Sequence, residues 1–347
     1  MNDDLISRKK PIYPVGDDLR KYLKHYSRVS VCQVQYNDLL HFRNSFPVYD
    51  RFGKDTLWES VSYAPEEMEH LNKTLTGMYA LLKTAGDISV IEHLYVERVD
   101  YCTFGNSKPF RVKIVNNYND NYDYFYIKQA DSSRIYGLEL EHILSPNRIS
   151  YFVYRETLVE EHIAGIPGDM FINTYLGRQE MNPIRLAKEF VKFNERCFVR
   201  LLGDMRAYNY VVDITPDFED VHYRIRAIDF DQQSFEGRRS LYMPQYFKDN
   251  NAIVELCIQH MTPQTVHQYQ VEERTLIARR IGSAKHMIRE LVETMKKDPI
   301  STPEKVQQLS EELSAFYKST EFLKCKSMGS LVKTSLKEMI RRNKHHL

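Results

Sequence analysis

The sequence predicts an α+β protein with two lobes, a small one built on an antiparallel sheet and a large helical one, preceded by a partly helical N-terminal extension. Three observations predict this class. Apolar and polar residues alternate between about 90 and 130, as they do in half-buried strands. After about residue 180 the apolar residues recur at helical spacing instead. The chain has 347 residues, which is enough for two such lobes.

These patterns place the extension at 1–90, the sheet lobe at 91–163 and the helical lobe at 164–347. The extension consists of short helical stretches that are interrupted by prolines, among them Pro47. Its pattern indicates no chemistry. We therefore expect it to carry specificity or to offer a surface to a protein partner.

The first half of the chain contains one long helix, then strands, then a short helix. Pro65 begins a helix that runs to about Thr84, because proline is favoured in the first helical turn. Apolar and basic residues alternate over 110–114, and after a turn rich in Asn and Asp the residues 124–129 form another strand. Together with the stretch before 110 these strands make a three-stranded meander. A helix follows over 132–144, with a serine available as its cap.

The second half is mainly helical. Asn182 caps a helix whose first residue is Pro183, and an apolar stripe continues along it to Gly203. We expect one long helix over 271–297. The segment 301–304 begins the next helix with the spacing of a capping box.

Composition excludes several classes of protein. Hydrophobic residues make up 42% and charged residues 27%, which is typical of a globular core rather than of a disordered chain. Lys and Arg number 48 against 47 Asp and Glu, so no charge excess points to a polyanionic partner. We therefore expect no nucleic-acid partner.

The expected compartment is the cytoplasm. The first residues, Met1-Asn2-Asp3-Asp4, lack the basic start and apolar run of a signal peptide. No stretch approaches the length of apolar sequence that a membrane span needs, so we expect none. The five cysteines are odd in number and widely spaced, as buried free thiols in a reducing compartment would be.

The strongest chemical signal is the pair Asp204 and Asn209, five positions apart in a segment that follows a helix and precedes a strand. An aspartate in such a loop can orient an acceptor hydroxyl or take its proton. An asparagine there can bind a magnesium ion that neutralises phosphate charge. The ordinary alternative is a turn built from Asp and Asn, which needs no catalytic role.

Two more carboxylates follow the strand that ends near residue 228. Asp229 comes directly after this apolar stretch, where a buried carboxylate needs a partner, and a metal ion is one such partner. A hydrogen bond to a turn is the alternative. Asp231 is a candidate second metal ligand or a solvated turn residue.

Lys128 ends a strand whose other members are mostly apolar or aromatic. Its ammonium is a candidate phosphate ligand, and the alternative is an edge-strand lysine whose charged end reaches water. Glu139 and Glu141, on the helix that follows, are the candidate ion-pair partners of this lysine, and the sequence does not choose between them.

Lys128, Asp204, Asn209 and Asp229, in this order, resemble the residues shared by the protein-kinase-like superfamily, which includes protein kinases and aminoglycoside phosphotransferases. The resemblance covers roughly residues 95–260. It implies a bilobal protein-kinase-like fold that uses ATP and Mg²⁺. It also implies that Lys128 holds the phosphates and that Asp204 orients the acceptor hydroxyl. Asn209 and Asp229 would hold the metal.

Details of the motifs divide the superfamily. Gly203 directly before Asp204 is similar to the aminoglycoside phosphotransferases, and no His-Arg pair precedes the aspartate. Tyr126 shares a strand face with Lys128, and in that branch a tyrosine at this position stacks on adenine. Arg206, however, resembles the arginine of the tyrosine-kinase loop, and it would steady either the transferring phosphate or the substrate. The glycine-rich phosphate loop of protein kinases is nearly absent.

The resemblance also places the linker between the lobes near 158–166. Backbone groups of Glu161 and Ile163 would face the edge of the adenine, and an ordinary strand end is the alternative.

The sequence therefore predicts an ATP- and Mg²⁺-dependent phosphotransferase that acts on a hydroxyl of a small molecule or a protein. The alternative is a catalytically inactive pseudokinase that serves as a binding module, with docking through 1–90 or the C-terminal helices. A third reading is an unrelated protein with chance matches. The acceptor itself is not identified by the sequence.

Overall fold

The computed structural model describes residues 10–50, 52–84, 92–216 and 221–343. The chain divides into two compact units, each assembled from separated segments. Among the described residues, the sheet unit comprises 14–131 and 149–162. The helical unit comprises 10–13, 132–148 and 163–343.

The sheet unit is built on an antiparallel sheet whose strands, in the order β1-β2-β3-β4-β5-β7-β6, all pair with antiparallel neighbours. Its strands are β1 (Asn44–Tyr49), β2 (Asp55–Ser62), β3 (Leu94–Cys102), β4 (Phe110–Asn116), β5 (Tyr122–Gln129), β6 (Tyr151–Tyr154) and β7 (Thr157–Glu161).

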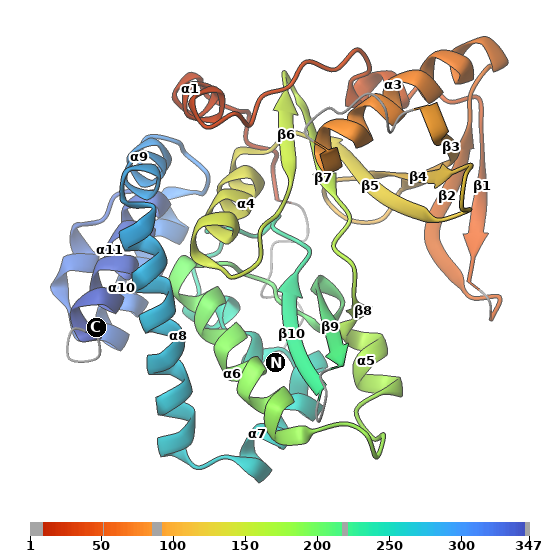
Figure 1. Ribbon diagram of the computed structural model, residues 1–347. Helices are drawn as coiled ribbons and strands as arrows, with labels where there is room; N and C mark the ends of the chain where they lie inside the picture. Colours follow the sequence, from red (N-terminus) through yellow and green to blue (C-terminus); the bar gives the residue numbers. More distant parts are fainter. Residues whose placement is uncertain (1–9, 51, 85–91, 217–220, 344–347) are drawn as a thin grey trace. The chain divides into compact units, whose positions relative to one another are not determined.

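The helices of this unit are α1 (Asp17–His25), α2 (Tyr36–Leu39) and α3 (Pro65–Thr84). Helix α3 contacts β3, β4 and β7 and crosses one face of the sheet (Figure 1). Between them lies the core of the unit, in which Leu75 of the helix and Phe125 of β5 are both fully buried. Alternation along the strands therefore leaves the neighbours of Phe125 on the opposite face of the sheet.

The segment 1–90 differs from its prediction, although the helix over 65–84 is confirmed. Strands β1 and β2 lie in this segment and extend the sheet beyond β3, so residues 14–50 and 52–84 belong to the sheet unit rather than to a separate extension. The prediction missed β1 because most of its residues are exposed and one is Pro47, so the strand shows little alternation. The first nine residues, including the stretch used to argue for the cytoplasm, lie outside the described residues.

The helical unit includes the helix α4 (Ser132–Leu144), which matches the predicted bounds but not the predicted lobe. Its other α-helices are α5 (Gly168–Thr174), α6 (Pro183–Arg200), α7 (Asn251–His260), α8 (Pro263–Ser283), α9 (Lys285–Met295), α10 (Pro303–Tyr317) and α11 (Met328–Arg342).

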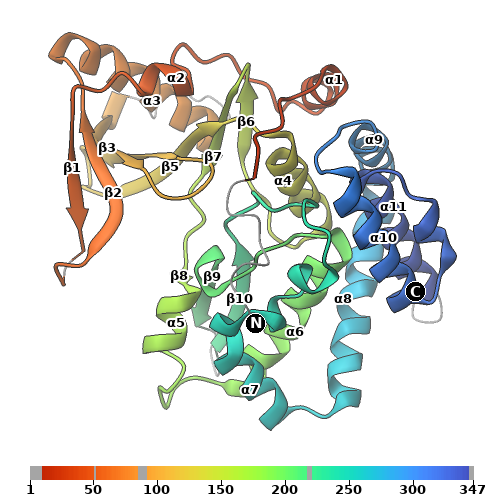
Figure 2. The ribbon, with the colours of Figure 1, turned by 180° about the vertical axis from the view of Figure 1, so that it is seen from behind.

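Helix α6 is central to this unit. It contacts α7, α8 and α11, and Figure 2 shows it side by side with α8. As predicted, Asn182 caps it by accepting a hydrogen bond from the backbone N–H of Arg185. The expected single helix over 271–297 is wrong: α8 ends at Ser283 and α9 starts at Lys285.

Three strands complete the helical unit: β8 (Ile166–Pro167), β9 (Tyr210–Pro216) and β10 (Val221–Ala227). They form a small sheet in the order β10-β9-β8. The unit also has short 3-10 turns. One of them, η3 (Ala207–Asn209), lies directly before β9. Three more lie between β10 and α7: η4 (Arg239–Tyr242), η5 (Pro244–Tyr246) and η6 (Lys248–Asn250). A further turn, η7 (Thr320–Lys324), separates α10 from α11.

The predicted combination of an antiparallel sheet with many helices is confirmed. The protein-kinase-like arrangement of two lobes stays a prediction. Within the described part of the chain, no helix is both long enough and apolar enough to cross a bilayer.

Candidate functional site

The β9–β10 hairpin brings Asn209 and Asp229 together. Tyr210, the first residue of β9, pairs with Ala227, the last residue of β10. Beyond this pair the backbone N–H of Ile228 donates to the carbonyl oxygen of Asn209 at 3.0 Å. Asn209 and Asp229 therefore flank the same end of the hairpin, although they are far apart in sequence.

Asp204 joins this pair through the loop after α6. The helix ends in a left-handed residue, Leu201 with φ 56°, and Asp204 itself has φ 57°. The side-chain amide of Asn209 donates to the backbone oxygen of Asp204 at 2.7 Å and lies 3.5 Å from its Oδ2. The amide nitrogen of Asn209 is thus the group that faces this loop.

Asp204 has an unusual acidity. Its Oδ1 accepts a hydrogen bond from Arg206 Nε at 3.0 Å. Burial nevertheless raises the pKa of Asp204 to about 7, helped by the negative charge of Asp229 and opposed by Arg206. A carboxylate with this pKa suits proton transfer near neutral pH. The structure thus brings Asp204, Arg206, Asn209 and Asp229 together in the helical unit.

A cation that the sequence prediction missed holds the two carboxylates after β10. Arg134 of α4 donates through Nη1 to Asp229 Oδ1 at 2.8 Å and to Asp231 Oδ1 at 2.7 Å. Its side chain is only 1% exposed. Helix α4 is buried on nearly every side, and a charged residue on such a helix needs a charged partner.

A buried asparagine from a later part of the chain, Asn250, supports the loop that contains Asp204. Asn250 Nδ2 donates to the backbone oxygens of Met205 at 2.9 Å and Pro244 at 2.8 Å. Its Oδ1 accepts from the hydroxyl of Tyr210 at 2.9 Å. One fully buried side chain therefore ties the loop after Asp204 to the first residue of β9.

Lys128 has a different partner from the two that were predicted. Its Nζ lies 3.0 Å from Glu160 Oε2 of β7, and both side chains are buried. The strands explain this pairing, because Lys128 lies opposite Leu158 and Glu160 is the diagonal neighbour on the same face. Glu141 instead pairs with Arg200 of α6, and Glu139 is buried within α4. Within the sheet unit, the partner of Lys128 is therefore Glu160.

Tyr126 and Lys128 share a face of β5, as alternation requires, with the lysine Nζ 5.5 Å from the centre of the tyrosine ring. The Tyr126 hydroxyl lies 3.2 Å from His162 Nδ1. On the same face the guanidinium of Arg111 stacks 4.3 Å from the centre of the Trp58 ring. This face of the sheet unit therefore carries aromatic rings beside two cations, each of which is paired with a carboxylate: Lys128 with Glu160 and Arg111 with Asp100.

The two residues that were assigned to the linker are both placed by the structure. Glu161 accepts a hydrogen bond from the backbone N–H of Ser150 at 2.7 Å and lies 3.6 Å from Lys83 Nζ. Ile163 is buried in the helical unit. Their proposed backbone contacts with adenine stay a prediction.

We call the carboxylates of Asp204, Asp229, Asp231 and Asp249, with the arginines that contact them, the acidic cluster. Its composition fits magnesium better than a metal that needs many protein ligands. Across the described ranges, no three His, Cys, Asp or Glu side chains are grouped so that they alone could hold a metal. Magnesium is commonly held by one or two carboxylates together with substrate phosphates. The amide oxygen of Asn209 and the Asp229 carboxylate, which is 36% exposed, match that requirement.

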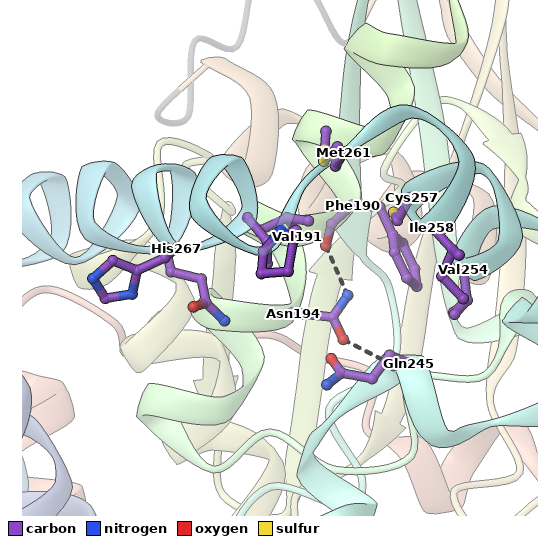
Figure 3. Close-up of a pocket in the computed structure, with 12 residues that line it drawn as sticks. Phe190, Val191, Asn194, Gln245, Val254, Cys257, Ile258, Met261 and His267 are labelled. Atoms are coloured by element: carbon purple, nitrogen blue, oxygen red, sulfur yellow. Dashed lines mark hydrogen bonds between the residues drawn. The ribbon is translucent and has the colours of Figure 1, made fainter.

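A separate cavity of about 560 Å³ lies where α6, α7 and the start of α8 meet (Figure 3). Figure 3 shows Asn194 bonded to the carbonyl oxygen of Phe190 and to the backbone of Gln245, at 2.7 and 2.8 Å. The other residues that line this cavity are largely apolar: Val191, Val254, Cys257, Ile258, Met261, Pro263, Val266, His267 and Gln270. None of these residues belongs to the acidic cluster, so the two are distinct features.

No protein-family model and no curated protein matches this chain. Among solved structures it is similar to the autoinhibited serine kinase domain of the giant muscle protein titin, with 12% identity and a TM-score of 0.27 over 70% of this chain and 92% of that one. It is also similar to titin kinase with its flanking domains, with 11% identity and a TM-score of 0.24 over 70% of this chain and 54% of that one. These TM-scores are too low to support an inference about activity.

Proposed function

We propose that this protein is a phosphotransferase that moves the γ-phosphate of ATP to a hydroxyl group. The observation that carries the proposal is the convergence of Asp204, Asn209 and Asp229 at the end of the β9–β10 hairpin. A loop carboxylate with a pKa near neutral, beside an amide and a second carboxylate, is the set that phosphoryl transfer to a hydroxyl requires.

Each side chain has a defined task in this proposal. Asp204 is held by Arg206 through Oδ1, so that Oδ2 is the oxygen that orients the acceptor hydroxyl and takes its proton. Asn209 and Asp229 are the residues that would hold magnesium, which neutralises phosphate charge when bound. On the sheet unit, Lys128 would contact phosphates and Tyr126 would stack on adenine.

The test is the substitution Asp204→Asn, which keeps the shape of the side chain and removes the base. We expect the rate of ADP production in the presence of ATP and Mg²⁺ to fall by about 10²–10⁴-fold. Binding of a non-hydrolysable ATP analogue should remain. Asp213→Asn, on the same hairpin, is the matched control and should leave the rate unchanged. Normal turnover in the Asp204 variant would exclude its proposed role.

The alternative function is a binding module without catalysis, and one observation favours it. Arg134 already pairs with the carboxylates of both Asp229 and Asp231, so these side chains have a purely structural partner. Thermal unfolding in the presence of ATP and Mg²⁺ separates the two functions. A scaffold that has lost nucleotide binding shows no change in Tm, whereas a phosphotransferase is stabilised by its ligand.

A further inference from the structure

Arg134 occupies the position between two carboxylates where a cation would otherwise lie. One nitrogen, Nη1, has two hydrogens and donates to Asp229 Oδ1 at 2.8 Å and to Asp231 Oδ1 at 2.7 Å. Both oxygens therefore point at the same atom. The guanidinium is almost completely buried, so water screens its charge weakly and its interaction with both carboxylates is strong.

The segment around these carboxylates is held rigidly to α4. Asp229 Oδ1 also accepts the backbone N–H of Asp231 at 3.0 Å, which fixes the two carboxylates relative to each other. Ser133 Oγ, next to the arginine, donates to the backbone oxygen of Gln233 at 2.7 Å. Arg134 is thus a fixed part of the acidic cluster and not a surface side chain that happens to lie nearby.

We infer that the guanidinium of Arg134 takes the place of a metal ion between Asp229 and Asp231. This inference rests on the proposed function for its second half: the cluster then accepts one divalent cation, through Asn209 and Asp229, rather than two. Asp231 is in this view the counter-ion of the arginine and not a metal ligand. A divalent cation between the same two oxygens would face a buried positive charge at very short range.

The charges of the cluster agree with a single divalent ion. Four carboxylates belong to it: Asp204 interacts electrostatically with Asp229 and Asp249, and Asp231 shares Arg134 with Asp229. Two guanidinium groups, those of Arg134 and Arg206, oppose them. With Asp204 ionised, as it is above its raised pKa, two negative charges remain, which one divalent cation balances.

The experiment counts Mn²⁺ bound per chain by equilibrium dialysis or by the loss of the free-ion EPR signal. The full chain and the variant R134Q are compared, each with and without a non-hydrolysable ATP analogue. We expect R134Q to bind one more Mn²⁺ than the natural chain, because the pair Asp229 and Asp231 is then open to an ion. Equal numbers in the two proteins would overturn the inference.

The same measurement separates this inference from the proposed function. If the natural chain binds no Mn²⁺ with the nucleotide analogue and R134Q binds one, the role of Arg134 stands and the proposed function fails. If the natural chain binds two, the inference fails and the proposed function stands.

A second comparison covers the outcome in which R134Q does not fold. The variants R134K and D231N should each bind the same number of Mn²⁺ ions as the natural chain, because the first keeps a cation and the second alters only its counter-ion. Loss of one ion in D231N would make Asp231 a metal ligand and overturn the inference. If R134Q folds, it should melt at a lower temperature than the natural chain in EDTA, and Mn²⁺ should restore part of the difference.

Discussion

At the scale of single residues, the acidity of Asp204 has two separable consequences. The first concerns activity. Burial raises the pKa of this carboxyl to about 7, and the base form is the one that accepts a proton. For the proposed phosphotransferase, we expect kcat/KM to rise with pH through about 7. This rise is the acidic limb of the pH profile. A plot of kcat/KM against pH measures it directly, because kcat/KM reports the pKa values of the free enzyme.

Two variants should move this limb in opposite directions. Arg206→Gln removes the cation that lowers the pKa of Asp204, so the limb should move to higher pH. Asp249→Asn removes a negative charge that raises the pKa, so the limb should move to lower pH. Shifts of the same sign in both variants would mean that another group titrates in this range.

The second consequence concerns stability and needs no activity. The folded-state pKa of Asp204 lies above its ordinary value of 3.8, so folding favours the neutral form. The contribution of this group to stability is therefore fully present below about pH 4 and is lost as the pH rises through about 7. Asp204→Asn, which is always neutral, should gain stability relative to the natural chain over that range, on the order of 2–4 kcal/mol.

Urea unfolding of both proteins at about pH 5 and about pH 8 tests this prediction. The free energy of unfolding of the variant should exceed that of the natural chain by more at about pH 8 than at about pH 5. A difference that is independent of pH would show that Asp204 ionises normally in the folded chain.

At the scale of elements, Asn250 connects the turn before α7 to the Asp204 loop and to β9. It makes three hydrogen bonds, to Met205, Pro244 and Tyr210, while fully buried. Asn250→Leu would leave these buried groups without partners, and each unsatisfied group costs about 1–3 kcal/mol. We expect a loss of about 2–5 kcal/mol in the free energy of unfolding.

Chemical denaturation measures this loss, and Asn117→Leu on an exposed turn of the sheet unit is the control, with an expected effect below about 0.5 kcal/mol. A loss in Asn250→Leu as small as that of the control would show that its hydrogen bonds do not hold the loop.

Elements with strong local signals were the ones that the sequence predicted well. The bounds 65–84 and 132–144 match α3 and α4, and Asn182 caps α6 as expected. The break between α8 and α9 was missed although Gly282 and Ser283 lie directly before Ala284, where the backbone leaves the helical conformation. A glycine–serine pair is a common cause of helix kinks, so the local sequence did carry a mark of this break.

The candidate site was predictable only where its chemistry is local. Asp204 and Asn209 are five residues apart, and their contact follows from one loop. Arg134 is 95 residues from Asp229, and that contact depends on how α4 packs. Lys128 pairs across strands with Glu160, a neighbour that only the register of the sheet reveals.

At the scale of the whole molecule, the two units have separate cores that are interleaved in sequence. The chain passes between them near residues 13, 131, 148 and 162. The core of the sheet unit lies between α3 and the sheet, and the helical unit is packed around α6. Two cores permit two unfolding transitions, so a single free energy of unfolding need not describe the chain.

Two core substitutions test whether the units unfold separately. Leu75→Ala in α3 and Leu309→Ala in α10 each remove a fully buried side chain, at a cost of about 2–5 kcal/mol. We expect Leu75→Ala to lower amide hydrogen-exchange protection mainly in β3, β4 and β5, and Leu309→Ala to lower it mainly in the helical unit. Each variant serves as the control for the other. If both substitutions reduce protection evenly over the two units, the cores unfold as one cooperative structure. A loss of packing in one unit would then lower the stability of residues in the other unit, far from the substituted side chain.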